Sequence, residues 1–367
     1  MEALILSCGT GGGHNAAGNA IREELLRRGH QVQMMDPYSI KSDHLTSTVS
    51  NTYVHMAQRV PNAFGAVYHL GNLYRKLPFR SPIYFLNARM VSCMEEFLCR
   101  HHFDAVIMPH LFPAEILTNM KQRGIPIPRT IFIATDYTCI PFTEETDCDC
   151  YITPSKDLSD EFCSRGLPRD RIYPLGIPVS SAFSAPLTQA QAKQALGLDR
   201  QTRYILVSGG SMGAGNLQSA IALLLERFGG SGTEVIAICG NNRALYEQLQ
   251  ETHSEGLILV GQTSRMAEYM RACDLVITKP GGLSSTEAAV SGSALIHITP
   301  IPGCETSNMQ FFEERGMAAA VGSLSGELIP ACEKLLRPGA REAMIQRQHA
   351  FINPHAAAEI CDLAENL

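Results

Sequence analysis

Residues 3–16 read ALILSCGTGGGHNA, and this stretch decides the fold. A short apolar run comes first, a glycine-rich turn follows, and apolar residues at helical spacing then continue to Arg28, before Gly29. A buried strand, a glycine-rich turn and a helix in this order begin a doubly wound α/β domain. Because backbone N–H groups at such a turn and at the helix N-terminus face the same space, the turn predicts a site for an anionic ligand.

The same plan begins again in the second half of the chain. Residues 203–207 form an apolar run, residues 208–215 read SGGSMGAG, and a helical pattern covers 217–227. Elsewhere short apolar runs alternate with helical patterns, which is typical of parallel sheets covered by helices on both faces. The stretch 178–200 is rich in Ser, Ala and Pro, and we expect it to link two domains.

These patterns predict an α/β protein of two Rossmann-like, doubly wound domains that face a cleft. The expected N-terminal domain covers residues 1–180, the C-terminal domain covers 181–345, and a helical segment at 346–367 packs back towards the N-terminal domain.

Composition narrows the class of protein. The 367 residues are 45% hydrophobic and 18% charged, as in ordinary globular proteins of about two domains. Thirty Lys and Arg stand against 36 Asp and Glu, and the net charge of −6 argues against a nucleic-acid binder. No apolar run approaches the roughly 20 residues of a membrane span, and no signal peptide is expected. Twelve scattered cysteines favour reduced thiols in the cytoplasm over a disulfide framework.

One segment departs from this even mixture of charges. No Asp or Glu occurs from His44 to Met94, while cations alternate there with aromatic and aliphatic side chains. Such a surface suits contact with anionic lipid, where each cation contributes about 1 kcal/mol. The alternative is a pair of core helices with solvated Lys and Arg. The candidate membrane-contacting residues are Arg75, Lys76, Phe79 and Arg80.

The first glycine-rich turn carries two possible functions. Gly11, Gly13 and Ala16 fit the relaxed dinucleotide fingerprint, and Asp36 follows where a ribose-binding acid would stand. This pattern alone supports a nicotinamide-dependent oxidoreductase. His14 lies in the same turn, where it could cap the helix or point into the cleft as a base or hydrogen-bond donor.

Three motifs in the second half supply groups that suit a sugar nucleotide. Residues 208–215 and 279–286 place glycines and hydroxyls where strands give way to helices, which suits a diphosphate, although neither is a P-loop. Glu287 follows one turn later and can accept two vicinal hydroxyls. Glu305 and Asn308 present a carboxylate and an amide, which suit sugar hydroxyls.

Together and in this order, the motifs resemble those of the glycosyltransferases that make monogalactosyl- and glucosyl-diacylglycerol. This group, within glycosyltransferase family 28, contains bacterial processive diacylglycerol glucosyltransferases and plant galactolipid synthases. The sequence is more distantly similar to the N-acetylglucosaminyltransferase that forms lipid II. The resemblance covers nearly the whole chain, through Gly11-Gly12-Gly13-His14, His110, Thr135-Asp136-Tyr137, Lys279-Pro280-Gly281-Gly282 and Pro302-Gly303-Cys304-Glu305.

The resemblance implies a GT-B fold and an inverting enzyme that transfers a hexose from a UDP-sugar to a lipid acceptor. Diacylglycerol is the first candidate for this acceptor. No cofactor or essential metal is implied. The enzyme would work on the inner face of the cell membrane, touching it through the acid-free segment. His14 is the first candidate base and Asp136 the second. The family usually has Gln where Cys304 stands, so one contact to the donor sugar is missing.

By the same resemblance, each domain has its own substrate. The implied acceptor-binding residues are Gly12, Gly13, His110 and Tyr137. The implied donor-binding residues are Gly210, Ser211, Met212, Arg265, Met266, Gly281, Gly282, Leu283, Ser284, Glu287, Glu305 and Asn308.

Three alternatives stay open beside the nicotinamide-dependent enzyme. The acceptor could be another lipid or a polyisoprenoid, or the chain could be a non-catalytic UDP-sugar-binding partner of a membrane protein. Asp147-Cys148-Asp149 looks like the Asp-x-Asp metal motif of the other main glycosyltransferase fold, but it lies in an acid-rich loop of the expected acceptor domain.

Overall fold

A computed structural model describes residues 1–9, 12–42, 46, 68, 70–75, 77, 79–210, 216–252 and 254–367. The chain divides into two compact units. Unit 1 contains Met1–Ser180, Pro302–Cys304 and His355–Leu367, and unit 2 contains Ser181–Ile301 and Glu305–Pro354.

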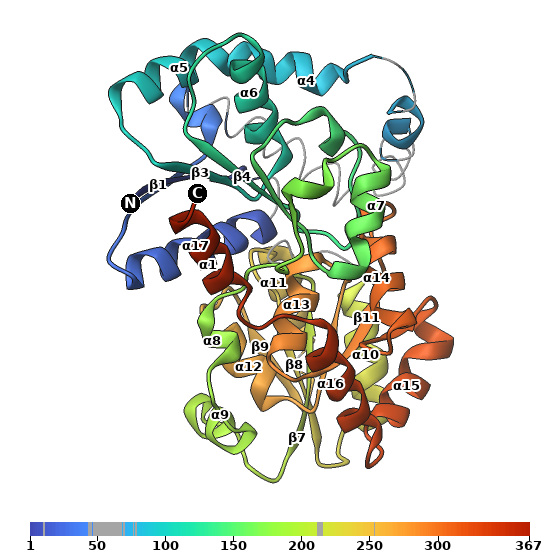
Figure 1. Ribbon diagram of the computed structural model, residues 1–367. Helices are drawn as coiled ribbons and strands as arrows, with labels where there is room; N and C mark the ends of the chain where they lie inside the picture. Colours follow the sequence, from blue (N-terminus) through green and yellow to red (C-terminus); the bar gives the residue numbers. More distant parts are fainter. Residues whose placement is uncertain are drawn as a thin grey trace. The chain divides into compact units, whose positions relative to one another are not determined.

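Unit 1 is built on a parallel sheet of six strands in the order β2-β1-β3-β4-β5-β6. Apolar side chains of β1, β3, β4 and β5 form its core together with residues of the flanking helices. In Figure 1, α4, α5 and α6 lie on one side of this sheet and α1 and α17 on the other. The strands are β1 (Glu2–Leu6), β2 (Gln31–Met35), β3 (Ala105–Met108), β4 (Arg129–Ile133), β5 (Cys150–Ile152) and β6 (Ile172–Tyr173). The helices are α1 (Gly12–Arg27), α4 (Pro82–Asn87), α5 (Val91–Arg100), α6 (Leu111–Gln122), α7 (Ser159–Ser164) and α17 (Ala356–Glu365), with 3-10 turns at Pro37–Ile40, Ala88–Met90, Thr143–Glu145, Lys156–Leu158 and Arg169–Arg171.

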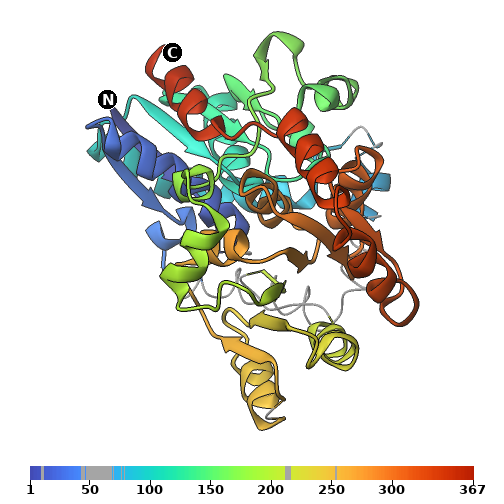
Figure 2. The same ribbon diagram turned by 90° about the horizontal axis from the view of Figure 1, so that it is seen from below.

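The C-terminal helix α17 belongs to unit 1, where it packs beside α1. Ile360 and Cys361 are fully buried in the same core as Ile21 of α1. At the rim, Arg28 donates from Nη1 to Asp362 Oδ1 over 2.6 Å. Figures 1 and 2 show the two helices side by side from both directions. The last helix therefore closes the core of the first unit, although unit 2 separates them in sequence.

Unit 2 repeats the plan with a second parallel sheet of six strands, in the order β12-β11-β10-β7-β8-β9. The strands are β7 (Arg203–Ser208), β8 (Thr233–Ile238), β9 (Leu257–Val260), β10 (Leu275–Thr278), β11 (Ala294–Ile298) and β12 (Ala319–Val321). The helices are α8 (Ser181–Ser184), α9 (Gln189–Leu196), α10 (Leu217–Phe228), α11 (Arg243–Glu251), α12 (Met266–Ala272), α13 (Gly282–Val290), α14 (Cys304–Glu314), α15 (Leu324–Leu335) and α16 (Ala340–Phe351). Two doubly wound α/β units confirm the predicted fold class.

The chain passes from unit 1 to unit 2 between Ser180 and Ser181, so residues 181–200 of the expected linker are part of unit 2. Thr188 and Gln191 cap α9 reciprocally, which is the capping box that starts a stable helix. Gln189 Nε2 donates to the carbonyl of Ala272 over 3.1 Å and so ties α9 to the end of α12. The Ser, Ala and Pro content that suggested a linker belongs to a short helix packed on its own domain.

Both sheets have a switch point, which is where doubly wound domains bind ligands. In unit 1 the chain passes from β1 to β2 on one side and returns to β3 on the other. In unit 2 it passes from β7 to β8 and returns to β10. In unit 1, the loops that follow β1 and β3 therefore start next to each other. In unit 2, the same holds for the loops that follow β7 and β10. Among the described helices, none is long and apolar enough to cross a bilayer.

Candidate active site

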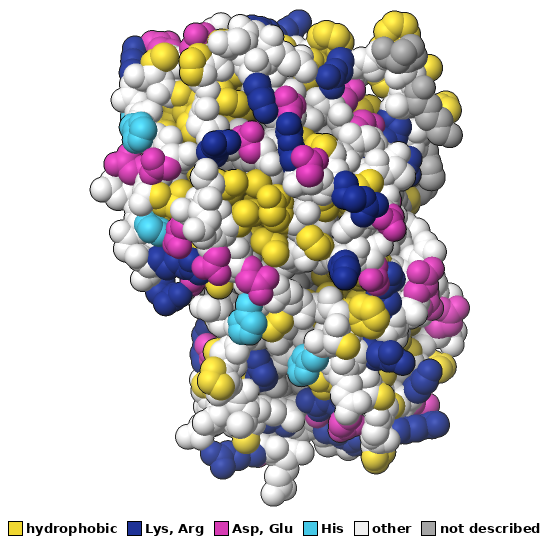
Figure 3. Space-filling model, in the orientation of Figure 1, with side chains coloured by type: hydrophobic (Ala, Val, Ile, Leu, Met, Phe, Trp, Pro, Cys, Tyr) yellow, Lys and Arg dark blue, Asp and Glu magenta, His cyan; other side chains and the backbone are white. Residues whose placement is uncertain are grey.

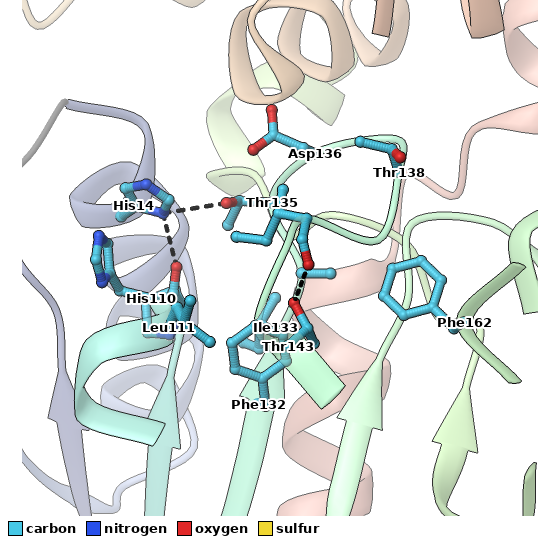
Figure 4. Close-up of a pocket in the computed structure, with 13 residues that line it drawn as sticks. His14, His110, Leu111, Phe132, Ile133, Thr135, Asp136, Thr138, Thr143 and Phe162 are labelled. Atoms are coloured by element: carbon cyan, nitrogen blue, oxygen red, sulfur yellow. Dashed lines mark hydrogen bonds between the residues drawn. The ribbon is translucent and has the colours of Figure 1, made fainter. Parts of the chain in front are cut away.

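His14 lies at the switch point of unit 1, in the first turn of α1. Its Nδ1 is 2.7 Å from the carbonyl oxygen of Pro109 and 3.0 Å from Oγ1 of Thr135. These partners follow β3 and β4, so three neighbouring strands converge on one imidazole ring. Figure 4 shows both contacts. The ring thus contacts loops that are 95 and 121 residues away in sequence.

These contacts fix which nitrogen of His14 carries the proton. A carbonyl oxygen can only accept, so Nδ1 donates its hydrogen to Pro109. The hydroxyl oxygen of Thr135 is then a second acceptor of the same N–H. Nε2 of the neutral ring keeps its lone pair and can accept a proton. Burial lowers the pKa of His14 below its ordinary 6.5, while the charge of Asp136 and the bond to Pro109 oppose this shift. His14 is therefore neutral, and a competent base, at neutral pH.

His110 is buried and packs against the ring of His14. The two rings meet edge to face with their centroids 4.5 Å apart. Nδ1 of His110 accepts the N–H of Phe112 over 3.1 Å and so caps α6. Burial, with a smaller effect from His14, holds the pKa of His110 well below its ordinary value. His110 is therefore buried and neutral, and it lines the pocket beside His14.

A pocket opens beside these rings. Figure 4 shows His14 and Asp136 on its polar side, with Phe132 and Phe162 among the apolar side chains below. Thr135 and Thr138 add hydroxyls, and Leu111, Ile133 and Ile140 add apolar surface. A base beside an apolar recess suits the hydroxyl of an amphipathic acceptor. Of the other predicted acceptor residues, Gly12 and Gly13 lie in the first turn of α1, while Tyr137 is buried.

Several of the predicted donor residues follow β7 and β10, at the switch point of unit 2. A side-chain carbon placed on Gly210, after β7, would lie 3.5 Å from Cε of Lys279 and 3.8 Å from Oγ of Ser284. Gly281 is the N-cap of α13, Gly282 is its first residue, and the side chain of Leu283 is buried. The structure therefore brings Gly210 and residues 279–284 together. Ser211 and Met212 lie outside the described residues.

Two carboxylates predicted for the donor differ in their surroundings. Within the described residues, the side chain of Glu287 has no hydrogen-bond or ion-pair partner, and burial raises its pKa to about 8. Glu305, in contrast, pairs through Oε1 with Lys279 and accepts the N–H of Ile301 at Oε2 over 2.8 Å. Asn308 is buried and donates to the carbonyl of Pro280 over 3.0 Å. Glu287 is available for a ligand, whereas Glu305 and Asn308 are engaged within the protein.

Arg265 and Met266 follow β9, the edge strand two positions from β7. The guanidinium of Arg265 binds Glu268 and donates to the carbonyl of Ala195 over 2.7 Å.

The predicted membrane-contacting residues separate into buried and exposed ones. Arg75 has a side chain only 4% exposed, because its guanidinium pairs with Glu144 over 2.6 Å. Arg80 donates to the carbonyl of Glu145 over 2.7 Å and lies over the ring of Tyr84. Phe79 is 68% exposed, and Lys76 lies outside the described residues. This burial argues against a direct lipid contact for Arg75.

The aspartates that suggested a nicotinamide-dependent enzyme or an Asp-x-Asp metal motif form hydrogen bonds and ion pairs within unit 1. Asp36 accepts the N–H of Tyr38 and caps a 3-10 turn, so the acid predicted for a ribose is engaged. Asp147 pairs with Arg171 over 2.7 Å, and Asp149 accepts from the backbone and hydroxyl of Thr130. No group of three or more His, Cys, Asp or Glu in the described part of the chain is arranged to hold a metal ion.

The sequence suggested His14 as a candidate base, but it did not indicate the contacts of the ring with Pro109 and Thr135. Thr135 follows β4 and was named in the motif Thr135-Asp136-Tyr137, but its hydroxyl was not expected to contact His14. The carbonyl of Pro109 gives no sequence signal, since every residue has one.

Two family models match the chain in succession. Residues 14–179 match monogalactosyldiacylglycerol (MGDG) synthase, and residues 204–356 match the glycosyltransferase family 28 C-terminal domain. The processive diacylglycerol beta-glucosyltransferase of Bacillus pumilus is 24% identical, over 98% of this chain and 94% of its own length. The enzyme of the same name from Bacillus subtilis is 26% identical, over 91% and 87%.

The fold also matches solved structures. MurG from Acinetobacter baumannii aligns with a TM-score of 0.63 at 16% identity, covering 100% of this chain and 99% of that one. The likeness confirms the predicted GT-B fold with its two Rossmann-like domains.

Proposed function

We propose that the chain is a member of glycosyltransferase family 28 with an N-terminal domain of the MGDG synthase type, and that it transfers a hexose from a UDP-sugar to diacylglycerol. The observation that carries the proposal is the fixed orientation of His14. A neutral imidazole whose Nε2 keeps its lone pair, next to an apolar pocket, is what deprotonation of a lipid hydroxyl needs. Relatives named as diacylglycerol glucosyltransferases, aligned over nearly the whole chain, support the choice of acceptor.

The proposed reaction is a single displacement. The acceptor oxygen attacks the anomeric carbon of the sugar as its proton passes to Nε2 of His14, and the bond from that carbon to the diphosphate breaks. UDP leaves with the electron pair, and the configuration inverts. Asp136 and the carbonyl of Pro109 both favour the charged imidazolium that forms, so they stabilise the transition state. In this scheme Asp136 assists the base rather than replacing it.

The proposed donor site lies at the switch point of unit 2. Gly210, Gly281 and Gly282 offer backbone N–H groups and close approach to a diphosphate, and Ser284 adds a hydroxyl. The carboxylate of Glu287, which has no partner among the residues that the structure describes, would accept the ribose hydroxyls. These groups could meet the diphosphate charge without a resident metal, which we retain as part of the proposal.

We further propose that unit 1 touches the membrane. Most of its exposed large apolar side chains fall within residues 70–86, and these are Leu70, Leu73, Leu77, Phe79, Phe85 and Leu86. Figure 3 shows hydrophobic side chains at the upper right edge, near α4. Apolar side chains concentrated in this way are costly in water and favourable at a lipid interface. All twelve cysteines are free, which supports a site on the cytoplasmic face.

The decisive test combines binding with transfer. Purified protein is mixed with UDP-glucose or UDP-galactose and diacylglycerol in vesicles, and products are read by mass spectrometry. We expect hexosyl-diacylglycerol from wild type and none above background from His14→Ala. Wild type that binds UDP but transfers to no lipid, polyisoprenoids included, would favour a non-catalytic UDP-sugar-binding role. Product formed only with a polyisoprenoid would keep the chemistry and change the acceptor.

A further inference from the structure

Lys279 stands at the centre of the proposed donor site, yet no role has been assigned to it. It follows β10 directly and is only 8% exposed. Gly210, across the switch point, has φ +69°, and a side chain there would meet Cε of Lys279 at 3.5 Å. The positive φ favours glycine at this position, and the 3.5 Å separation shows that the lysine stem lies in van der Waals range of the turn.

The ammonium of Lys279 is held by one carboxylate. Nζ pairs with Oε1 of Glu305, whose other oxygen accepts the backbone N–H of Ile301. Asn308 holds the next residue of the same loop through the carbonyl of Pro280. The two side chains that the sequence suggested for the sugar thus fix the position of the lysine and its loop.

This arrangement leaves hydrogen-bonding capacity unused. A lysine ammonium carries three N–H donors, and Lys279 has one hydrogen-bond partner among the described residues. Buried polar groups are normally satisfied, and an incompletely satisfied buried cation is costly. The stem of Lys279 lies beside Gly210, and Oε1 of Glu305, which binds Nζ, lies beside Gly281 at the start of α13, where the helix N-terminus also favours negative charge. A ligand with several anionic oxygens would satisfy all of these groups.

We propose that Lys279 binds the diphosphate of the nucleotide donor and stabilises it as it leaves, and that Glu305 is a positioning residue for Lys279. The inference rests on the proposed function and adds the charged group that its donor site lacks. As the bond between the anomeric carbon and the β-phosphate oxygen breaks, the electron pair stays on that oxygen. The N–H groups of Lys279 then strengthen their hydrogen bonds to the growing charge, without transfer of a proton.

The test compares two ligands that differ in the diphosphate alone. Calorimetry measures the affinities of UDP and uridine for wild type and for Lys279→Met. We expect Lys279→Met to bind UDP about 10- to 100-fold more weakly and to bind uridine as wild type does. Because removing one partner of a buried ion pair can unfold a protein, a second variant replaces both, Lys279→Met with Glu305→Met. Thermal unfolding checks that it is folded, and we expect the same selective loss.

A third variant separates positioning from sugar contact. Glu305→Gln should weaken UDP and UDP-glucose by the same factor, because under this proposal the carboxylate does not touch the sugar. A loss confined to UDP-glucose would overturn the role given to Glu305. Unchanged UDP affinity in the folded double variant would overturn the role of Lys279. Wild type that binds neither UDP nor uridine would instead refute the proposed function itself, and this inference with it.

Discussion

The ionisation of Glu287 should control nucleoside binding. The side chain has no partner among the described residues, and burial raises its pKa to about 8. With that pKa, about 3% of the carboxyl groups are ionised at pH 6.5 and about 75% at pH 8.5. If the carboxylate is the form that accepts the two ribose hydroxyls, as charge-assisted hydrogen bonding favours, affinity rises with pH.

The expected change in uridine affinity follows from these ionised fractions. Uridine should bind up to about 25-fold more tightly at pH 8.5 than at pH 6.5, which corresponds to about 1.9 kcal/mol. Uridine is the right ligand, because it has no phosphate whose own titration would enter the result. Glu287→Gln, which cannot ionise, should bind uridine weakly and with nearly the same affinity at both pH values.

Calorimetry at several pH values between 6 and 8.5 measures this effect. A second control uses 2′,3′-dideoxyuridine, which lacks the hydroxyls and should show little pH dependence with wild type. The reasoning fails if wild type and Glu287→Gln have the same pH dependence for uridine, or if the dideoxynucleoside follows uridine.

The remaining predictions concern the base, the fold and the membrane. His14→Ala should lower kcat by about 10²- to 10⁴-fold while UDP affinity, measured by calorimetry, stays unchanged. The acidic limb of the kcat/KM profile against pH should lie below pH 6.5, because burial lowers the pKa of His14. Asp136→Asn should move this limb to still lower pH, because the charge that raises the pKa of His14 is lost. A limb that stays in place would contradict the role given to Asp136. Glu115 is fully buried with its pKa raised from 4.5 to about 8, so its acid form stabilises the fold and this contribution falls as pH rises between those values. Relative to Glu115→Gln, wild type should lose about 3 kcal/mol of unfolding free energy between pH 5.5 and 8 in urea titrations, and parallel curves would show that Glu115 does not ionise on unfolding. Replacing Leu73 and Phe79 with Ser should reduce sedimentation with anionic vesicles several-fold without changing UDP affinity, and undiminished binding would place the membrane contact elsewhere.

The sequence predicted the fold because its signals are local. Each domain begins with an apolar strand, a glycine-rich turn and a helix, and each of these can be recognised within about 25 residues. The stretch 178–200 was misjudged because composition was weighed above capping. Thr188 followed three residues later by Gln191 is a helix-start signal that the Ser, Ala and Pro content obscured.

The site was predicted only in part because its geometry depends on strand order. His14 could be selected as a histidine in a glycine-rich turn. Its contacts with Pro109 and Thr135 exist because β3 and β4 follow β1 in the sheet, which no local pattern specifies. The same holds for Arg75, which looked like a surface cation until its pairing with Glu144, 69 residues away, was seen.

The central claim is that His14 activates a diacylglycerol hydroxyl toward a UDP-hexose. The most direct measurement supplies purified protein with diacylglycerol vesicles and UDP-glucose or UDP-galactose, and follows both UDP release and the lipid product. We predict one UDP released for each hexose transferred to diacylglycerol, an inverted anomeric configuration by NMR, and loss of both products in His14→Ala. Full transfer by a folded His14→Ala variant, or product with retained configuration, would contradict the account.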